Sequence, residues 1–376
     1  MDRGRPAGAR RQSHDVIPHT FGESAPFSLG VEEELMILDA ETFEQVAAVD
    51  RILRGVEGLA LPGRLKTELF ASVFETNTNV CATVGEVDEA LPALRRAAAL
   101  AAEREGLAIA ASGTHPFARP EAQPIVKEER YVTFLGYGGI SVRRQGVQGL
   151  HVHVGMASAD DCWRCLDAIL PWLPVVLALS ANSPWFAGEL TGMASNRAPI
   201  LAELPRGGAP AAFSSYAEWE AWIERLVAIG VMEDYTRIWW DVRPHPQLGT
   251  LEVRVPDQPT DVALSSAFAA LVQAMCATAL DDGLPGGSPR ADYIQNRWAA
   301  ARFGPRANLV HPDGLSFPTA GYLASELLER VRPAARRLGS ADVLARLDPA
   351  RCEADAQLQE THPRAVAAAL VRRSLA

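Results

Sequence analysis

The segment from Leu150 to Gly155 constrains the fold of this chain more than any other. Its sequence, Leu-His-Val-His-Val-Gly, alternates between imidazole and small or apolar side chains. A β-strand places successive residues on opposite faces, so His151 and His153 would share one face and two valines the other. The segment therefore predicts a strand with one face in a core and the other face carrying polar chemistry.

Two further segments have the same design. Around residues 27–38, Glu32 and Glu34 share one face, while Glu33 interrupts an otherwise apolar opposite face. Near Pro256, Glu252 and Arg254 alternate with leucine and valine in the same way. A sheet built from such strands would bury its back and present histidine, glutamate and arginine on its front.

Periodicity and breaker residues give a coarse map of the remaining chain. We expect strands at residues 27–38, 66–80, 107–112, 146–156 and 249–256. We expect helices at residues 88–105, 128–135, 158–180, 216–232, 260–280, 292–302 and 317–338, with Thr260 as a helix cap and two prolines kinking or splitting the third helix. Because these elements are intermixed and several strands are of antiparallel type, the pattern favours an α+β fold over a doubly wound α/β fold.

The domain organisation follows from composition. Residues 1–25 are polar, interrupted by glycine and proline, and aperiodic, which predicts a disordered N-terminal extension. Residues 26–376 show no repeat and no linker, so we expect a single catalytic domain there. Neither a Gly-x-Gly-x-x-Gly motif after a strand nor a Walker A motif is present, so neither common phosphate-binding loop is expected.

Charge and cysteine content narrow the function classes. The net charge is −10 and no basic face is visible, which argues against a nucleic-acid partner and suits divalent cations. We expect no membrane span, no secretory signal and a cytoplasmic location with reduced thiols. Cys162 and Cys165 form a Cys-x-x-Cys in a predicted helix, and without a second cysteine pair a zinc or redox site is disfavoured.

Each polar pair allows more than one interpretation. Glu32 and Glu34 repel each other unless they hold a cation or share a proton, and the alternative is an exposed edge strand. His151 and His153 have the spacing of metal ligands but could be hydrogen-bonded histidines beside the core. Glu252 with Arg254 could be a structural salt bridge, or a metal ligand beside a phosphate clamp.

The pairs become more specific when they are taken together. Glu75, with Asn77, adds a fourth polar pair on a predicted strand. A site with mostly carboxylate oxygens and one or two imidazoles is typical of Mg²⁺ or Mn²⁺ and not of zinc. Such ions neutralise phosphate oxygens during phosphoryl transfer.

Several motifs in order resemble one family, the carboxylate–amine ligases or type 2 glutamate–cysteine ligases. The motifs are Gly-Val-Glu-Glu-Glu-Leu (30–35), Gly-Leu-His-Val-His-Val-Gly (149–155), Ala-Asn-Ser-Pro (181–184), Thr-Gly-Met-Ala-Ser-Asn-Arg (191–197), Trp-Trp-Asp-Val-Arg-Pro-His-Pro (239–246) and Leu-Gly-Thr-Leu-Glu-Val-Arg-Val-Pro-Asp (248–257). The resemblance covers about residues 27–338. It implies a glutamine-synthetase-like fold, in which a curved, mainly antiparallel sheet forms the active-site wall and helices cover its outer face.

The resemblance also implies roles for individual residues. The expected metal ligands are Glu32, Glu34, Glu75, His151 and Glu252, with a substrate-binding role as the alternative for Glu75. The expected catalytic residues are Arg254 as phosphate clamp, His153 facing the phosphate or acyl group, and Arg197. The expected nucleotide-binding residues are Arg254, His153 and Arg243, and both Arg197 and Arg243 are candidates for substrate carboxylates or the transferred phosphate.

The implied reaction uses ATP and Mg²⁺ or Mn²⁺ to join two small molecules. A carboxylate such as the γ-carboxylate of glutamate becomes an acyl phosphate, and an amine such as that of cysteine then displaces phosphate to give an amide. We expect these small-molecule substrates and neither a nucleic-acid nor a membrane partner, and a homodimer is compatible with the sequence. The rivals are a non-catalytic nucleotide- or metabolite-binding homologue and a metal-dependent hydrolase.

The sequence also departs from the family pattern. Glu189 and Leu190 stand where an Arg-Asp pair is expected, and Pro256 stands where a cysteine is expected. The Gly-rich segment expected near the C-terminus is replaced around residues 351–355, and the tail is shortened. The substitution of an acidic for a basic residue at 189 would alter or abolish recognition of an anionic substrate such as glutamate.

Overall fold

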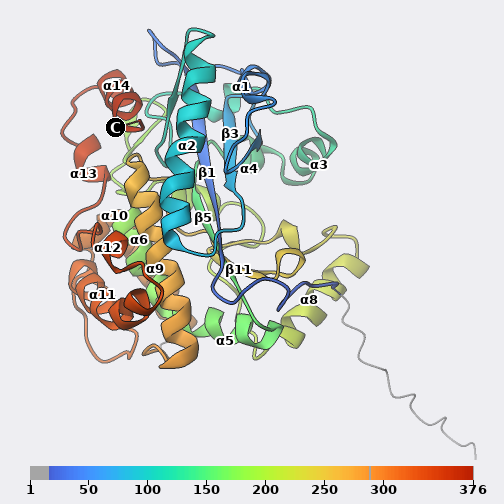
Figure 1. The fold of residues 1–376 in the computed structure, drawn as a ribbon, viewed down its shortest axis with the longest axis vertical. Helices are drawn as coiled ribbons and strands as arrows, with labels where there is room; N and C mark the ends of the chain where they lie inside the picture. Colours follow the sequence, from blue (N-terminus) through green and yellow to red (C-terminus); the bar gives the residue numbers. More distant parts are fainter. Residues whose placement is uncertain (1–16, 288, 376) are drawn as a thin grey trace, which may run out of the picture.

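The computed structural model describes residues 17–287 and 289–375 of the chain (Figure 1). Residues 1–16 of the expected N-terminal extension lie outside the described residues. The rest of that extension, residues 17–25, packs on the domain. The Thr20 amide donates to the carbonyl of Pro246 (2.9 Å), the Gly22 amide donates to that of Met156 (3.0 Å), and Phe21 is buried. Within the described residues, the boundary expected at residue 26 is therefore too late.

A seven-stranded antiparallel sheet organises the molecule, as the sequence predicts. Its strands follow the order β10-β11-β5-β1-β3-β2, with β4 also paired to β1. Their bounds are Leu29–Asp39 (β1), Gly63–Thr67 (β2), Val73–Thr78 (β3), Leu107–Ala110 (β4), Leu150–Gly155 (β5), Val242–His245 (β10) and Thr250–Val253 (β11). Two small two-stranded sheets are formed by Trp185–Phe186 (β6) with Glu189–Leu190 (β7), and by Gly207–Gly208 (β8) with Trp239–Trp240 (β9).

Helices surround this sheet. The α-helices are Val49–Val56 (α1), Val84–Glu103 (α2), Glu129–Gly138 (α3), Ile140–Arg143 (α4), Ala159–Ile169 (α5), Leu173–Ser180 (α6), Arg197–Leu201 (α7), Tyr216–Ala228 (α8), Val262–Asp281 (α9), Arg290–Phe303 (α10), Ala320–Arg337 (α11), Ala341–Leu344 (α12), Ala354–Gln357 (α13) and Pro363–Arg373 (α14). Short 3-10 turns cover Pro120–Ala122, Leu170–Trp172, Tyr235–Arg237, Pro246–Leu248 and Gly304–Arg306.

Three local predictions need correction. The single strand expected at residues 66–80 is two strands, β2 and β3, joined by residues 68–72, the first of which is Glu68. Helix α9 is capped by Asp261, whose side chain accepts from the Ala263 amide, whereas the Thr260 hydroxyl donates to a carbonyl of Ala111. The helix expected at residues 128–135 is α3, which continues to Gly138 and has Gly139 as its C-cap. The expected split of the helix at residues 158–180 is confirmed, because a 3-10 turn separates α5 from α6.

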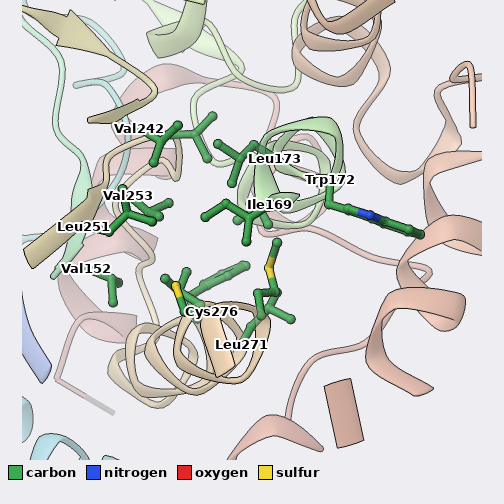
Figure 2. Close-up of a cluster of buried hydrophobic side chains, with 14 of the residues drawn as sticks. Val152, Ile169, Trp172, Leu173, Val242, Leu251, Val253, Leu271 and Cys276 are labelled. Atoms are coloured by element: carbon green, nitrogen blue, oxygen red, sulfur yellow. The ribbon is translucent and has the colours of Figure 1, made fainter. Parts of the chain in front are cut away.

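The main core lies between the back of the sheet and the helices. Figure 2 shows Val152, Leu251 and Val253 of the sheet facing Ile169 and Leu271 of the helices, and all five are buried. Helix α9 is apolar all round, which suits its central position, because it packs against α2, β5 and β1 (Figure 1). Burial of this face leaves the opposite face of the strands for polar side chains.

Two stretches have the length and apolar composition of a membrane span, although the sequence analysis expected none. They are Ala159–Ser180 and Val262–Asp281, and 78% of the apolar window of each is buried inside the fold. By composition alone the core helix of a soluble protein passes the same test. Packing in the core accounts for the apolar character of both stretches.

Candidate active site

The strand register brings the three predicted polar strands into one surface. Between β1 and β5, Glu32 pairs with His151, and between β5 and β11, Glu252 pairs with His153. Between β1 and β3, Glu34 pairs with Glu75. Residues that pair directly across an antiparallel sheet point to the same face. Side chains up to about two hundred residues apart in sequence therefore share the front of the sheet, as the sequence predicts.

The tightest group of possible metal ligands is Glu32, His153 and Glu252, whose ligand atoms all lie within 4.8 Å of one another. His153 Nε2 lies 3.7 Å from Glu32 Oε1 and 4.0 Å from Glu252 Oε1. This Nε2 atom is buried and has no hydrogen-bond partner within residues 17–287 and 289–375. His153 Nδ1 lies 3.0 Å from the Thr250 hydroxyl, an arrangement in which a Thr250-bound Nδ1–H leaves the Nε2 lone pair free for an ion.

The electrostatics of this group favour charged carboxylates. Burial acts to raise the pKa of Glu32, but hydrogen bonding to the imidazoles of His151 and His153 holds this pKa well below its usual value. Burial likewise acts on Glu252, where the charges of Arg243 and Arg254 hold the pKa well below normal. Two ionised carboxylates beside a free imidazole nitrogen fit a divalent cation, with oxygen as the predominant ligand.

The two histidines have different carboxylate neighbours. His151 is the expected metal ligand, and His153 is expected to face the phosphate or the acyl group. Here His151 Nδ1 lies 3.2 Å from Glu32 Oε2, and its Nε2 lies 3.9 Å from Glu34 Oε1. Burial, together with the charge of Arg254, lowers the pKa of His151 to about 3, so its imidazole is neutral. His151 therefore contacts Glu32 and lies near Glu34, beside the tight group that contains His153.

Glu34 and Glu75 lie beside this centre, opposite each other on β1 and β3. Burial and the nearby charge of Glu68 raise the pKa of Glu34 to about 7, although its Oε2 accepts from the Gly149 amide at 2.6 Å. Burial and the charge of Glu32 raise the pKa of Glu75 well above normal. Asn77 Nδ2 donates to both Glu32 Oε1 and Glu75 Oε1 at 2.7 Å and so joins the two carboxylates.

The three expected arginines have different surroundings. Arg254 forms a short ion pair with Glu252 and also lines the neighbouring cavity. Arg243 donates through Nε to Glu252 Oε2 (2.6 Å) and through Nη1 to two backbone carbonyls, and it is absent from the cavity lining. Arg197 donates to the carbonyls of Arg254 and Val255 and lines the cavity. The geometry therefore makes Arg243 a support for Glu252, while Arg254 and Arg197 face the space where a ligand would lie.

A cavity of about 370 Å³ adjoins the polar face of the sheet. Glu34, His151, Arg197 and Arg254 line it from the sheet side. Its remaining wall comes from segments that the sequence analysis did not assign to the site, and includes Glu68, Leu69, Phe70, Val73, Arg130, Tyr131, Phe134, Gln145, Gln148, Leu201, Leu204 and Trp239. A volume of this size lies within the range of small-molecule sites.

Glu68 is the most informative residue that sequence reasoning missed. Burial raises its pKa, and the Tyr131 hydroxyl donates to its Oε2 at 3.1 Å. The sequence offers one signal for this residue, a glutamate next to the apolar Leu69 and Phe70. The expected strand at residues 66–80 places Glu68 inside a strand, whereas it lies between β2 and β3. Trp239 lines the cavity and Trp240 is buried in the core.

Asp257 explains why the Asn-Ser-Pro and Ser-Asn-Arg motifs accompany the site. Its Oδ2 accepts from the Ser183 hydroxyl (2.6 Å) and its Oδ1 from the Ser195 hydroxyl (2.7 Å). Ser183 Oγ in turn accepts from the Arg197 amide at 3.1 Å. All four residues are buried, so this network fixes the start of α7 and with it the Arg197 side chain.

The unusual Glu189-Leu190 pair lies outside this arrangement. Both residues form the exposed strand β7, paired with β6, and neither lines the cavity. Pro256, which replaces the expected cysteine, accepts from the Leu150 amide through its carbonyl at 3.2 Å.

Comparisons with known proteins agree with these observations. Residues 28–358 match the sequence model of glutamate–cysteine ligase family 2. A Rubrobacter xylanophilus protein with the provisional name glutamate–cysteine ligase 2-3 is 39% identical over 321 residues, which cover 85% of this chain and 87% of that protein. A Herpetosiphon aurantiacus protein with the provisional name glutamate–cysteine ligase 2 is 38% identical over 320 residues, which cover 84% and 83%.

Solved structures share the fold at much lower identity. The glutamate–cysteine ligase of Francisella tularensis in complex with AMP gives a TM-score of 0.66 at 14% identity, covering 93% of this chain and 89% of that one. A bifunctional glutathione synthetase of Pasteurella multocida gives a TM-score of 0.63 at 14% identity, covering 93% of this chain and 52% of that one. These likenesses confirm the expected glutamine-synthetase-like architecture.

Proposed function

The chain belongs to glutamate–cysteine ligase family 2, and from that premise we propose that it joins the γ-carboxylate of glutamate, or of a related amino acid, to an amine through an acyl phosphate. Membership makes it an ATP-dependent ligase that forms C–N bonds. The observation that carries the proposal is the grouping of Glu32, His153 and Glu252 beside Arg254 and a cavity of small-molecule size. A substrate in that cavity would lie next to a centre that can neutralise phosphate.

The first step needs charge neutralisation and alignment, and the site is built for both. A carboxylate oxygen bonds to the γ-phosphorus of ATP while the bond to the bridging oxygen breaks, and ADP leaves with that electron pair. Mg²⁺ or Mn²⁺ held by Glu32, His153 and Glu252 would supply positive charge to the phosphate oxygens. Arg254, oriented by Glu252, adds a fixed cation that requires little reorganisation during the reaction.

The second step forms the amide. The amine nitrogen bonds to the acyl carbon, the bond from that carbon to the phosphate oxygen breaks, and phosphate leaves with the electron pair while the amine proton passes to water. Positioning supplies most of the acceleration, because no side-chain nucleophile is required.

One assay tests the proposal against its two rivals. Purified protein is incubated with ATP, Mg²⁺ and glutamate, with hydroxylamine as a small amine that traps an acyl phosphate. We expect phosphate release that depends on glutamate, together with formation of the hydroxamate. Cleavage of amide substrates without ATP would indicate a hydrolase, and nucleotide binding without turnover of any acid–amine pair would indicate a non-catalytic homologue.

A further inference from the structure

Part of the cavity wall away from the sheet is apolar, although Arg130, Glu233, Asp234 and Arg237 also line the cavity. Leu69, Phe70, Val73, Tyr131, Phe134, Leu201 and Leu204 belong to a hydrophobic cluster that is separate from the main core, and all of them line the cavity. Trp239 packs on this cluster and stacks on Phe134, with ring centroids 4.8 Å apart and planes inclined by 20°. A cluster that lines a cavity and includes stacked aromatic rings is suited to an apolar group of a ligand.

Polar atoms in the same lining lack partners. Arg197 Nε and Gln145 Oε1 are buried without a hydrogen bond in the described part of the chain. The orientation of the Gln145 amide is fixed, because its Nε2 donates to the carbonyls of Ser141 and Ile200, both at 3.0 Å. A buried donor and a buried acceptor that remain unpaired are costly and indicate a ligand that supplies the complementary groups.

These groups together match one kind of molecule. An unpaired guanidinium N–H suits a carboxylate, while an amide oxygen and the buried carboxylate of Glu68 suit an ammonium or amine. The apolar cluster suits a branched or aromatic side chain, which would be removed from water on binding there. An α-amino acid with an apolar side chain carries a carboxylate, an amine and an apolar group in one molecule.

We propose that this cavity selects, as the amine that accepts the acyl group, an α-amino acid with a large apolar side chain such as leucine or phenylalanine, and not cysteine. This inference rests on the proposed function. Glu34, His151 and Arg254 belong both to the cavity lining and to the polar face of the sheet, so an amine in the cavity lies beside the place of acyl transfer. The amide bond then forms, and phosphate leaves, as in the second step above.

The first test compares acceptors with the wild-type protein at fixed ATP, Mg²⁺ and glutamate. We expect leucine or phenylalanine to have a kcat/KM at least roughly tenfold above those of glycine, alanine and cysteine, since each buried methylene contributes a factor of this order. We also expect phenylalanine to exceed 2-phenylethylamine, which lacks the carboxylate, by roughly tenfold. Equal or better use of cysteine or glycine would overturn the inference.

The second test changes the apolar wall. Trp239→Ala should lower the ratio of kcat/KM for phenylalanine to that for hydroxylamine by roughly tenfold, because hydroxylamine makes no use of the wall. The matched control is Trp298→Ala, since Trp298 is 53% exposed and does not line the cavity, and it should leave the ratio unchanged. If Trp239→Ala raises the KM for ATP and leaves the amine preference intact, the wall holds the nucleotide base and the inference is wrong.

Direct binding separates this inference from the proposed function. Isothermal titration of phenylalanine into the wild-type protein, with Mg²⁺ and a non-hydrolysable ATP analogue, should show binding at least roughly tenfold tighter than that of glycine. Absence of hydroxylamine-dependent turnover would reject the proposed ligase activity, whereas absence of phenylalanine binding would reject the amino-acid cavity. The binding result decides the inference even when a wall variant fails to fold.

Discussion

Glu252 accepts from two arginines at once, and this determines what its replacement would do. Arg243 and Arg254 are both paired with this carboxylate, which is 1% exposed. Truncation to alanine would leave two largely buried cations without their partner, which costs about 3–5 kcal/mol for a buried pair. Loss of activity in such a variant would therefore mix loss of folding with loss of chemistry.

Glu252→Gln is the sharper variant, because it keeps the size of the side chain and one acceptor oxygen. We expect ligase turnover to fall by roughly a hundredfold or more, since a charged group of the phosphate centre is removed. The circular dichroism spectrum should stay that of the wild type. Glu218→Gln, on the exposed start of α8, is the matched control and should retain activity. Wild-type turnover by Glu252→Gln would remove this carboxylate from the mechanism.

The buried side chain of His115 should make the free energy of unfolding depend on pH, independently of the active site. Its Nδ1 accepts from the amides of Phe117 (3.2 Å) and Ala118 (2.9 Å), and its Nε2 lies 2.9 Å from the Phe43 carbonyl. The ring therefore carries its proton on Nε2 and has no place for a second. Burial lowers the pKa of His115 to about 4.

The direction of this pH dependence follows from the linkage between protonation of His115 and folding. Because the folded pKa lies below the unfolded value of about 6.5, the stabilisation is complete above pH ~6.5 and is lost as the pH falls towards ~4. The loss amounts to about 3 kcal/mol in the free energy of unfolding. Urea unfolding between pH 7 and 4 should show a weaker pH dependence for His115→Asn, which retains a local acceptor but does not titrate. An unchanged dependence would refute the assignment.

At the scale of elements, one buried arginine ties three segments to the central strand. Arg95 on α2 donates to Glu33 of β1 at 2.6 and 2.9 Å, and to the carbonyls of Pro259, Thr260 and Ser374. Gln258 donates to the same Glu33 carboxylate and accepts from the Glu34 amide. The back of β1 is therefore linked to the site on its front.

Arg95→Met should reduce the free energy of unfolding by about 3–5 kcal/mol, because Glu33 would remain buried without its partner. The double variant Arg95→Met with Glu33→Gln should recover part of this loss, since no unpaired charge remains. Denaturant titration of the two single variants and the double variant measures the coupling free energy. Additive effects would show that the pair is not coupled.

Strand faces were predictable at this scale, but strand bounds and partners were less so. Alternation placed Glu32, Glu34, Glu252 and Arg254 on the front face, and the structure agrees. The break between β2 and β3, which begins at Glu68, could not be predicted, because residues 66–80 contain many strand-forming residues and no strong turn signal. Glu33 was seen only as an interruption, because its partner Arg95 lies 62 residues away and nothing local identifies it.

At the scale of the whole molecule, an ion at the sheet face would stabilise the fold. Glu32, His153 and Glu252 come from three different strands, so an ion that binds only when they are assembled adds to the free energy of unfolding. With the ion at a hundred times its dissociation constant, the gain is about 2.7 kcal/mol. Thermal unfolding with and without Mn²⁺ should show a higher Tm with the ion.

The variant Glu32→Gln provides the control for this measurement. It removes one ligand charge from the group, so the Mn²⁺-dependent rise in Tm should shrink or disappear. Asp348→Asn, at an exposed position far along the chain, should keep the full rise. An equal rise in the wild type and in Glu32→Gln would place the ion elsewhere.

The sequence by itself determined which side chains face together along each strand, because the two-residue repeat of a β-strand is a local property. It also carried enough ordered motifs to identify the family and the antiparallel fold. Only the tertiary structure showed which histidine lies next to Glu32 and Glu252. It also showed that Arg243 pairs with Glu252 and that an apolar cluster lines the cavity. Register between strands and the packing of loops on the sheet depend on contacts between distant segments, which no local pattern records.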